Sequence, residues 1–373
     1  MKVLIDFEKK PLLFERPEAV LRCDDLAGLP SAFDKITQAL DRGFYAAGFL
    51  SYEAGGGFER CLKQERSLDF PLLMMGIYRR PEHRRLASAR CAAASVDDFR
   101  LNVSRSEYDS AIEQIRGFIA QGDVYQITYC AKFRFRFDGD PLALYAELLR
   151  RQTVPYPAYL ETGDFQILSL SPERFIRKSA SKVVVEPMKG TWRRGDNALS
   201  DLWARFRFSR DAKNRAENLM IADLLRNDLG RVGTRIAWPK LFTISPYATL
   251  FQMTSTVTGE VPQAGRLYDL FAALFPSGSV TGAPKIRAMQ IIRELENEPR
   301  RIYTGAIGYI TPERDLYFNV PIRTLLLRGQ SGEMGVGGGI IWDSTPQGEW
   351  DEIHLKASFL TVLARKTEEQ RAK

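Results

Sequence analysis

One stretch of the chain alternates with the two-residue period of a β-strand: Val124-Tyr125-Gln126-Ile127-Thr128-Tyr129-Cys130-Ala131-Lys132-Phe133-Arg134-Phe135-Arg136-Phe137. From Tyr125 onward its odd-numbered positions are aromatic or apolar, whereas the even-numbered positions include a glutamine, a threonine, a lysine and two arginines. Because successive side chains of a strand point to opposite faces, this stretch predicts a long strand with one apolar and one polar face.

The sequence on either side of this strand predicts a layered fold. Ser104 and Glu107 have the spacing of a capping box, which begins a helix that ends at Gly122. Further strands are predicted at Ala158–Glu161, Phe165–Leu170, Phe175–Lys178, Lys182–Pro187, Tyr303–Ile310, Leu316–Arg328 and Met334–Trp342. Further helices are predicted at Asp211–Leu229, Leu267–Phe275, Pro284–Glu296 and Glu349–Arg365. Because strands come in runs with helices between the runs, the order favours an α+β (mixed α/β) fold, with layered antiparallel-rich sheets flanked by helices, over a Rossmann or barrel architecture.

The length and composition indicate a globular protein that buries a large core. The chain has 373 residues, of which 45% are apolar and 27% are charged. A polar connection around Ser88–Asp98 predicts a boundary between an N-terminal part, residues 1–95, and a larger domain, residues 96–373. We expect the two parts to pack as one integrated fold.

Several classes of protein are disfavoured by the same composition. No apolar run approaches the roughly 20 residues that cross a bilayer, and Asp6 and Glu8 interrupt the start where a signal peptide would be apolar. We therefore expect a cytoplasmic protein with no membrane partner. The net charge of +7 is spread over scattered Lys and Arg, which fits a small anionic substrate or a solvated surface as well as nucleic acid. We expect no nucleic-acid partner.

The cysteines and histidines of the chain disfavour several kinds of catalytic or metal site. The four cysteines form no Cys-x-x-Cys pair, so neither a zinc site nor a disulfide framework is indicated. His83 and His354 are the only histidines, which disfavours a Ser-His-Asp triad or a multi-histidine metal site. The chemistry must therefore depend on Lys, Glu and Arg.

Lys189 is the strongest candidate for a reactive group. It follows a β-branched run in Val183-Val184-Val185-Glu186-Pro187-Met188-Lys189-Gly190-Thr191, which predicts a buried strand ending in a turn at Gly190. A desolvated amine loses part of its preference for the charged form and can act as a nucleophile or base. For an isolated lysine the simpler interpretation is a side chain that extends from a strand end to solvent.

A second group of candidates is carried by two predicted helices. Glu349, Glu352 and Lys356 fall at i, i+3 and i+7 and therefore share one helix face, while Glu217 lies in an apolar segment of another helix. Charges of this kind usually form a solvated face. The functional alternative is that Glu217 and Glu352 converge on one Mg²⁺, an ion that favours a few carboxylates, waters and a substrate oxygen.

Two glycine-rich segments predict close approach of an anion to the main chain. Gly278-Ser279-Val280-Thr281-Gly282-Ala283-Pro284-Lys285 leads into a helix but lacks the spacing of a nucleotide phosphate loop. Gly335–Ile340 contains four glycines in six residues. Arg323, on the polar side of its predicted strand, has the geometry to bind a carboxylate through two hydrogen bonds. A tight turn remains the alternative for either glycine segment alone.

Taken in order, these segments resemble the chorismate-utilising enzymes, over about residues 104–365 and more weakly at Gly48–Ala54. The motifs that carry the resemblance are Pro187–Thr191, Arg215–Asp228, Gly278–Lys285, Tyr303–Tyr309 and Gly337–Ile340. Five motifs in register are specific, whereas one glycine loop alone would be weak. The resemblance implies that residues 96–373 form a chorismate-binding catalytic domain. Within the family it is strongest to the members that aminate C4 of chorismate, which yields 4-amino-4-deoxychorismate for p-aminobenzoate and folate biosynthesis.

The resemblance implies a role for each matching residue. Lys189 matches the lysine that attacks C2 of chorismate, and Glu173 matches the general acid that protonates the departing C4 hydroxyl. Glu217 and Glu352 match ligands of Mg²⁺, the one implied cofactor, with Glu349 an acid outside them. The matching substrate-binding positions are Gln126, Thr281, Tyr303, Arg323, Lys356 and the amides of Gly337 and Gly339.

Two positions separate the activities of this family. Members that form isochorismate or salicylate carry a lysine base at the position of Gln126, and glutamine cannot remove a proton from water. Members that form anthranilate carry a small residue at the position of Lys189. The resemblance therefore favours amination at C4, with anthranilate formation as the alternative, or an inactive basic binding protein on the same fold.

Some positions depart from the family pattern, and some activities are expected in other proteins. Asn214 replaces an acid, Gln252 stands at a position that is often histidine, and Pro321 interrupts a predicted strand near Arg323. The chain carries no Cys-His-Glu glutaminase domain, so we expect ammonia from a separate glutamine amidotransferase subunit. We also expect the lyase that releases the aromatic product to be a separate protein.

Overall fold

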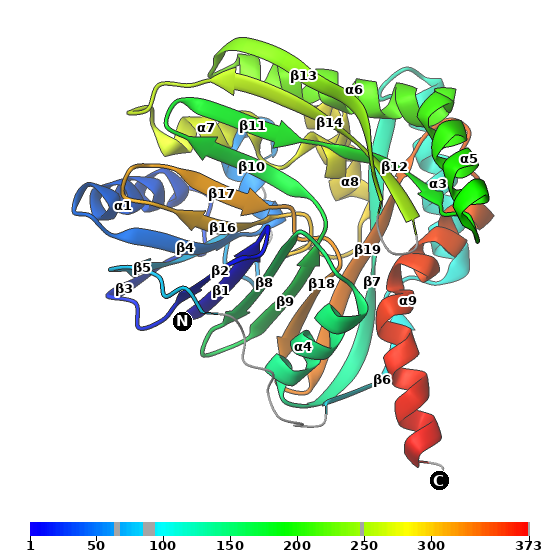
Figure 1. Cartoon of the computed structure of the whole chain (residues 1–373), viewed down its shortest axis with the longest axis horizontal. Helices are drawn as coiled ribbons and strands as arrows, with labels where there is room; N and C mark the ends of the chain where they lie inside the picture. The colour runs from blue at the N-terminus through cyan, green and yellow to red at the C-terminus, as the bar shows by residue number, and fades with distance from the viewer. Residues whose placement is uncertain (63–67, 85–93, 247–249, 372–373) are drawn as a thin grey trace.

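Two antiparallel sheets organise the chain (Figure 1). The structure, a computed structural model, describes residues 1–62, 68–84, 94–246 and 250–371. The nine-stranded sheet contains, in spatial order, β15 (Gly282–Ala283), β7 (Gln126–Gly139), β19 (Ser331–Ile340), β18 (Thr324–Arg328), β9 (Gln166–Ser171), β8 (Tyr156–Glu161), β1 (Lys2–Phe7) and β2 (Lys10–Phe14), with β6 (Ala94–Leu101) beside β7. The ten-stranded sheet contains β12 (Met188–Arg193), β14 (Leu250–Glu260), β11 (Lys182–Glu186), β10 (Arg174–Ser179), β17 (Leu316–Asn319), β16 (Ala306–Ile310), β4 (Tyr45–Leu50), β5 (Leu73–Tyr78) and β3 (Ala19–Cys23), with β13 (Thr234–Pro246) beside β14.

Helices cover the outer face of each sheet. Those packed on the nine-stranded sheet are α3 (Arg105–Ala120), α4 (Pro141–Arg151), α8 (Lys285–Leu295) and α9 (Pro346–Arg371). Those packed on the ten-stranded sheet are α1 (Leu29–Asp41), α6 (Ala212–Gly230) and α7 (Leu267–Leu274). The remaining helices are α2 (Gly55–Phe58), α5 (Ala198–Arg210) and the short 3₁₀ turns η1 (Tyr52–Ala54), η2 (Arg60–Leu62) and η3 (Gly278–Val280). This arrangement confirms the predicted α+β fold of layered antiparallel sheets.

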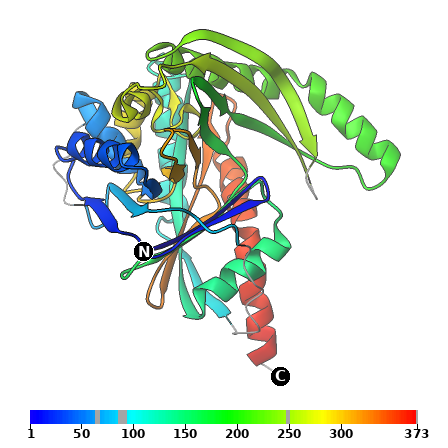
Figure 2. The same cartoon turned by 60° about the vertical axis from the view of Figure 1, so that its left-hand side comes forward.

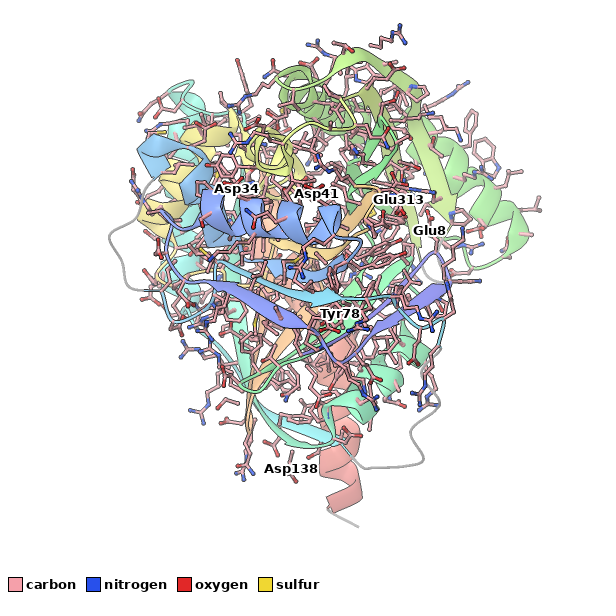
Figure 3. All side chains as sticks on the ribbon, turned by 90° about the vertical axis from the view of Figure 1, so that its left-hand side faces the viewer. Glu8, Asp34, Asp41, Tyr78, Asp138 and Glu313 are labelled. Atoms are coloured by element: carbon pink, nitrogen blue, oxygen red, sulfur yellow. The ribbon has the colours of Figure 1, made fainter. Side chains whose placement is uncertain are left out.

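A third apolar core lies between the two sheets. It joins Val3 and Ile5 of β1 and Ile167 of β9 to Phe49 of β4, all of them fully buried. Tyr78 of β5, labelled in Figure 3, packs its ring 5.4 Å from that of Phe14 at the same core. Side chains that alternate along each strand thus fill this core on one face and the helix-covered cores on the other.

Residues 1–95 contribute strands to both sheets. β1 pairs with β8 in one sheet, and β4 pairs with β16 in the other. The predicted connection at Ser88–Asp98 lies in part outside the described residues, which resume at Ala94 with β6. Figure 3 shows α1 crossing the N-terminal side of the molecule, where Asp34 and Asp41 pair with Arg266 and Arg314.

Several predicted elements are confirmed and one is wrong. Ser104 and Glu107 form the capping box of α3, and β7 is the long strand that alternation predicts. The predicted single strand Leu316–Arg328 is instead two strands, β17 and β18, that belong to different sheets. Pro321 lies between them and has no N–H to continue the ladder. Within the described part of the chain, no helix has the length and apolarity required to span a membrane.

Candidate active site

Lys189 lies on β12, a strand that the sequence pattern did not predict. The pairing of β12 with β14 shifts between Met188 and Thr191, and Gly190 inside this shift has a φ of +91°. A side chain there would be strained, and its Cβ would lie 2.7 Å from Oδ1 of Asn214 on α6. Gly190 therefore brings β12 close to α6. Asn218 of the same helix secures this contact, since its Nδ2 donates to the carbonyl of Lys189 at 3.4 Å and to that of Met253 at 3.1 Å.

The glycine run of β19 exposes backbone groups beside Lys189. Over the described residues β18 pairs with β19 only up to Met334, whereas β7 pairs with it as far as Ile340. The carbonyl of Gly337 accepts a hydrogen bond from Nζ of Lys356 at 2.6 Å, so Gly337 faces the edge that β18 leaves open. The N–H and C=O of a strand residue point to the same edge, and residues two apart share it. The amides of Gly337 and Gly339 are therefore directed to this open edge, and their role in binding substrate stays a prediction.

Gly339 lies beside two predicted site residues, Gln126 and Lys189. A Cβ added there would lie 2.9 Å from Nζ of Lys189 and would overlap Nε2 of Gln126. Gln126 is fully buried, yet neither its amide nitrogen nor its amide oxygen has a hydrogen-bond partner. Leaving a buried polar group unpaired costs about 1–3 kcal/mol. Such an amide beside a lysine amine is suited to bind a ligand that satisfies it.

The surroundings of Lys189 lower the pKa of its amine. Burial lowers the pKa of the amine, and the positive charge of Lys356 lowers it further. Glu217, Glu173 and Glu352 oppose this effect but do not outweigh it. The residue as a whole is partly exposed, while its amine lies deep among these side chains. Lys189 is therefore suited to act as a nucleophile.

Glu173 supplies an acid whose charge interacts with that of Lys189. It directly precedes β10, is only 4% exposed, and burial raises its pKa to about 7. Oγ of Ser279 donates to Oε1 of Glu173 at 2.5 Å, and Ser277 and Ser279 share a hydrogen bond of 2.9 Å. The sequence pattern identified the Gly278–Lys285 loop but gave no role to Ser279. A carboxyl with this pKa is partly protonated near neutral pH and can donate a proton.

The carboxylates predicted to bind a metal lie in the N-terminal parts of α6 and α9. Oε2 of Glu349 is buried with no hydrogen-bond partner, and a Cβ on Gly338 would contact it and lie 3.9 Å from Oε1 of Glu352. Glu352 pairs with Lys356 at 2.6 Å, and Oγ of Ser344 donates to Oε1 of Glu349 at 2.6 Å.

The charges of these carboxylates are coupled. Burial raises the pKa of Glu217 and of Glu349, and the negative charge of Glu352 adds to the increase in both. Burial acts in the same direction on Glu352, but Lys356 holds its pKa below the usual value. Among the described residues, no three Asp, Glu, Cys or His side chains form a complete metal cage. The donor set nevertheless fits Mg²⁺, which commonly takes one or two carboxylates and completes its shell with water and substrate oxygens.

The other predicted substrate-binding residues lie on separate segments of the chain. Tyr303 is buried against Gly335, whose added Cβ would lie 2.7 Å from that of Tyr303, on the strand face shared with Gly337 and Gly339. Thr281 is fully buried and its hydroxyl donates to the carbonyl of Ser277 at 3.1 Å. Arg323 has a φ of +50° in the connection between β17 and β18, and its Nη1 lies 3.4 Å from Oε1 of Gln152 beyond α4. It is therefore not on a strand face beside Asn319, as the single predicted strand required.

The chain is similar in sequence to several chorismate-utilising proteins. The chain is 37% identical over 265 residues to aminodeoxychorismate synthase component 1 of Escherichia coli, covering 70% of this chain and 58% of that protein. It is 34% identical over 340 residues to the protein of the same name from Klebsiella aerogenes, covering 84% and 75%. Anthranilate synthase component 1 of Aquifex aeolicus is 36% identical over 274 residues, covering 73% and 56%. The matches to the first and third of these thus span little more than half the length of the relatives.

Solved structures show the same fold. Anthranilate synthase component I from Streptococcus pneumoniae superimposes with a TM-score of 0.82 at 24% identity, over 96% of this chain and 92% of that one. The menaquinone-specific isochorismate synthase of Escherichia coli superimposes with a TM-score of 0.77 at 17% identity, over 97% and 88%. The sequence profile of the chorismate binding enzymes matches residues 21–362, and the chain belongs to this family.

Proposed function

We propose that this protein is an aminodeoxychorismate synthase component I, a transaminase-class enzyme that converts chorismate and ammonia into 4-amino-4-deoxychorismate. The observation that carries the proposal is the amine of Lys189, enclosed beside Gln126 and Gly339 with a lowered pKa. Four of the relatives with 34–37% identity bear this name, which supports the same activity.

The first step forms a covalent bond between the enzyme and the substrate. The neutral amine of Lys189 attacks C2 of chorismate, the two ring double bonds shift by one position, and the bond from C4 to its hydroxyl breaks. Glu173 donates the proton with which this hydroxyl leaves as water. Because the pKa of Glu173 is raised to about 7 by burial, an appreciable fraction carries this proton at neutral pH.

The second step transfers the amino group. Ammonia bonds to C4, the double bonds return to their original positions, and the bond between C2 and Lys189 breaks. The nitrogen of the adduct keeps both protons of the lysine amine, so Lys189 leaves as the neutral amine. The one proton lost by the incoming ammonia returns Glu173 to its acid form. Water must be excluded from C2 during both steps, and Gln126 fills the space beside Lys189 without offering a base.

Binding groups for the substrate carboxylates surround this centre. The amides of Gly337 and Gly339 and the ammonium of Lys356 face the open edge of β19. Glu217 and Glu352, with Glu349 behind them, would hold Mg²⁺. When bound, Mg²⁺ supplies positive charge that offsets a substrate carboxylate facing these acids.

Two partners belong to the proposal. The words "component 1" in the names of the relatives imply a separate subunit in those proteins. We infer that a glutamine amidotransferase subunit supplies ammonia to this chain, and that a separate lyase converts the product to p-aminobenzoate for folate synthesis in the cytoplasm.

An anthranilate synthase is the second candidate, because relatives of that name reach 36–37% identity. Direct attack of ammonia at C2 would leave no role for the enclosed amine of Lys189. Incubation of the protein with chorismate, ammonium and Mg²⁺, followed by chromatography of the products, distinguishes the two. We expect 4-amino-4-deoxychorismate as the main product. Anthranilate or isochorismate as the main product would refute the proposal.

The hydrogen bond between Ser279 and Glu173 predicts a change in pH dependence. Because this bond lowers the pKa of Glu173, Ser279→Ala should raise that pKa by roughly half a unit to one unit. Glu173 acts in its protonated form, so kcat of the wild type should fall above about pH 7. The variant should show this fall at higher pH.

The matched control is Ser277→Ala, which removes a hydroxyl that contacts Ser279. Its alkaline limb should move less than that of Ser279→Ala. If the limb of Ser279→Ala coincides with that of the wild type, Glu173 is not the group that titrates.

A further inference from the structure

The helix α5 exposes an apolar stripe. Leu199, Leu202, Trp203 and Phe206 fall at i, i+3, i+4 and i+7, which places them on one face of the helix. Their side chains are 76%, 65%, 63% and 44% exposed. Within the described residues, four of the twelve exposed large hydrophobic side chains therefore lie on this one helix. A contiguous patch of this kind on a soluble protein marks an interaction surface.

The stripe is not needed to hold α5 in place. Asn197 and Ser200 form a capping box at the start of the helix, and Phe208 on the opposite side is fully buried against Phe251 and Met253. Figure 2 shows the helix at the outer edge of the molecule. The core thus anchors α5 through its inner face and leaves the outer face for another protein.

Arginines surround the stripe. Arg205, Arg207 and Arg210 are exposed, and none of them forms an ion pair within the described part of the chain. Arg210 lies over the ring of Phe206 at 4.3 Å. Asp201 of α5 does not neutralise these three arginines, because it is paired with Arg194 at 2.6 Å. Trp, Phe and Arg are the residues that protein interfaces favour, and α5 has no lysine.

The position of α5 relates this surface to the candidate active site. The helix packs on β12, the strand that carries Lys189, and on the start of α6, the helix that carries Glu217. A protein bound to α5 would therefore lie beside the elements that form the site. A subunit that releases ammonia needs such a position, because ammonia that escapes into water becomes ammonium.

We propose that the face formed by Leu199, Leu202, Trp203 and Phe206 with Arg205, Arg207 and Arg210 is the docking surface for the glutamine amidotransferase subunit. The inference rests on the proposed function, which requires that subunit. The complementary surface is an apolar patch with an acidic rim. A second copy of this chain fits less well, since two copies of the face would bring six unpaired arginine charges together.

The test measures binding and activity on the same variants. Trp203→Asp places a charge in the middle of the face, and Val20→Asp is the control, because Val20 is a 39% exposed residue of β3 at the opposite end of the same sheet from β12. The affinity of each full-length protein for the glutamine amidotransferase subunit of the same organism is measured by titration calorimetry at low and moderate salt. Chorismate amination is then followed with ammonium and, separately, with glutamine and that subunit.

We expect Trp203→Asp to weaken the complex by about 100-fold and to abolish most glutamine-dependent amination, while ammonium-dependent amination stays within twofold of the wild type. Arg207→Glu should weaken the complex and reduce its sensitivity to salt, because an attractive charge pair is lost. Val20→Asp should bind as the wild type does.

Two results would overturn the docking surface. One is a Trp203→Asp protein that binds the subunit with unchanged affinity. The other is sedimentation of the isolated wild type as a dimer that Trp203→Asp separates, which would assign the face to a second copy. If the wild type shows no ammonium-dependent amination, the proposed function is refuted. The binding titration would still show whether this face is the docking surface.

Discussion

Lys189→Ala is expected to lower the rate of 4-amino-4-deoxychorismate formation by about 10³-fold or more, as removal of a covalent nucleophile usually does. The amine of Lys189 lies beside Gln126 and Gly339, and burial lowers its pKa, which favours the form that can bond to C2. Alanine would leave space at C2 in which ammonia could attack directly, so we expect a small yield of anthranilate. Product chromatography with ammonium as the nitrogen source measures both.

Lys182→Ala is the matched control, because Lys182 is an exposed lysine on β11, the strand that precedes β12 in the chain. It should keep the activity of the wild type. Intact-mass analysis of the wild type with chorismate and no ammonia should also show an adduct of chorismate less one water on the peptide that contains Lys189. Unchanged amination by Lys189→Ala would show that this lysine is not the nucleophile.

Glu352→Gln and Glu217→Gln are each expected to reduce chorismate turnover by at least about 10²-fold at low Mg²⁺. Each substitution removes one of the two negative charges predicted to bind the metal, and the charge of Glu352 helps to raise the pKa of Glu217. Activity should require Mg²⁺ in the wild type, and the Mg²⁺ concentration for half-maximal rate should rise in both variants. Chorismate consumption against Mg²⁺ concentration measures this effect.

Asp351→Asn is the control for these two substitutions, since Asp351 lies on the same helix but accepts a hydrogen bond from Gln347 on its exposed side. Thermal unfolding of the variants should match that of the wild type, because Glu217 and Glu352 lie at the rim of the site rather than in an apolar core. Full wild-type activity in excess EDTA would show that the carboxylates do not serve a metal.

Glu217 and Glu352 show which contacts the spacing of residues along the chain can predict. Glu349, Glu352 and Lys356 were expected on one helix face because i, i+3 and i+7 positions coincide on any α-helix, and α9 places them so. That Glu217 approaches them from another helix depends on how α6 packs against β12. Helical periodicity carries no information on that packing.

Secondary structure was predictable where a local cause operates. Alternation predicts β7 and a capping box predicts α3, because neighbouring residues decide both. The sequence pattern did not predict β12, because a glycine at position 190 indicates a turn. The pairing with β14 instead makes Gly190 an irregularity within a strand. The stretch Leu316–Arg328 alternates well enough for one strand, but its two halves enter different sheets. Which sheet a strand joins depends on pairing with distant residues, and the local sequence pattern does not predict that pairing.

The sequence by itself determined the class of fold, the family through five ordered motifs, and the reactive residue types, with Lys189 foremost. Only the tertiary structure decided which of these groups meet. In the folded chain the side-chain amide of Gln126 lies beside Gly339 without a hydrogen-bond partner, and Ser279 donates a hydrogen bond to Glu173. One face of α5 stays exposed. The reason is physical: burial and hydrogen bonding between residues more than a hundred positions apart depend on strand register and layer packing, and these are properties of the folded chain.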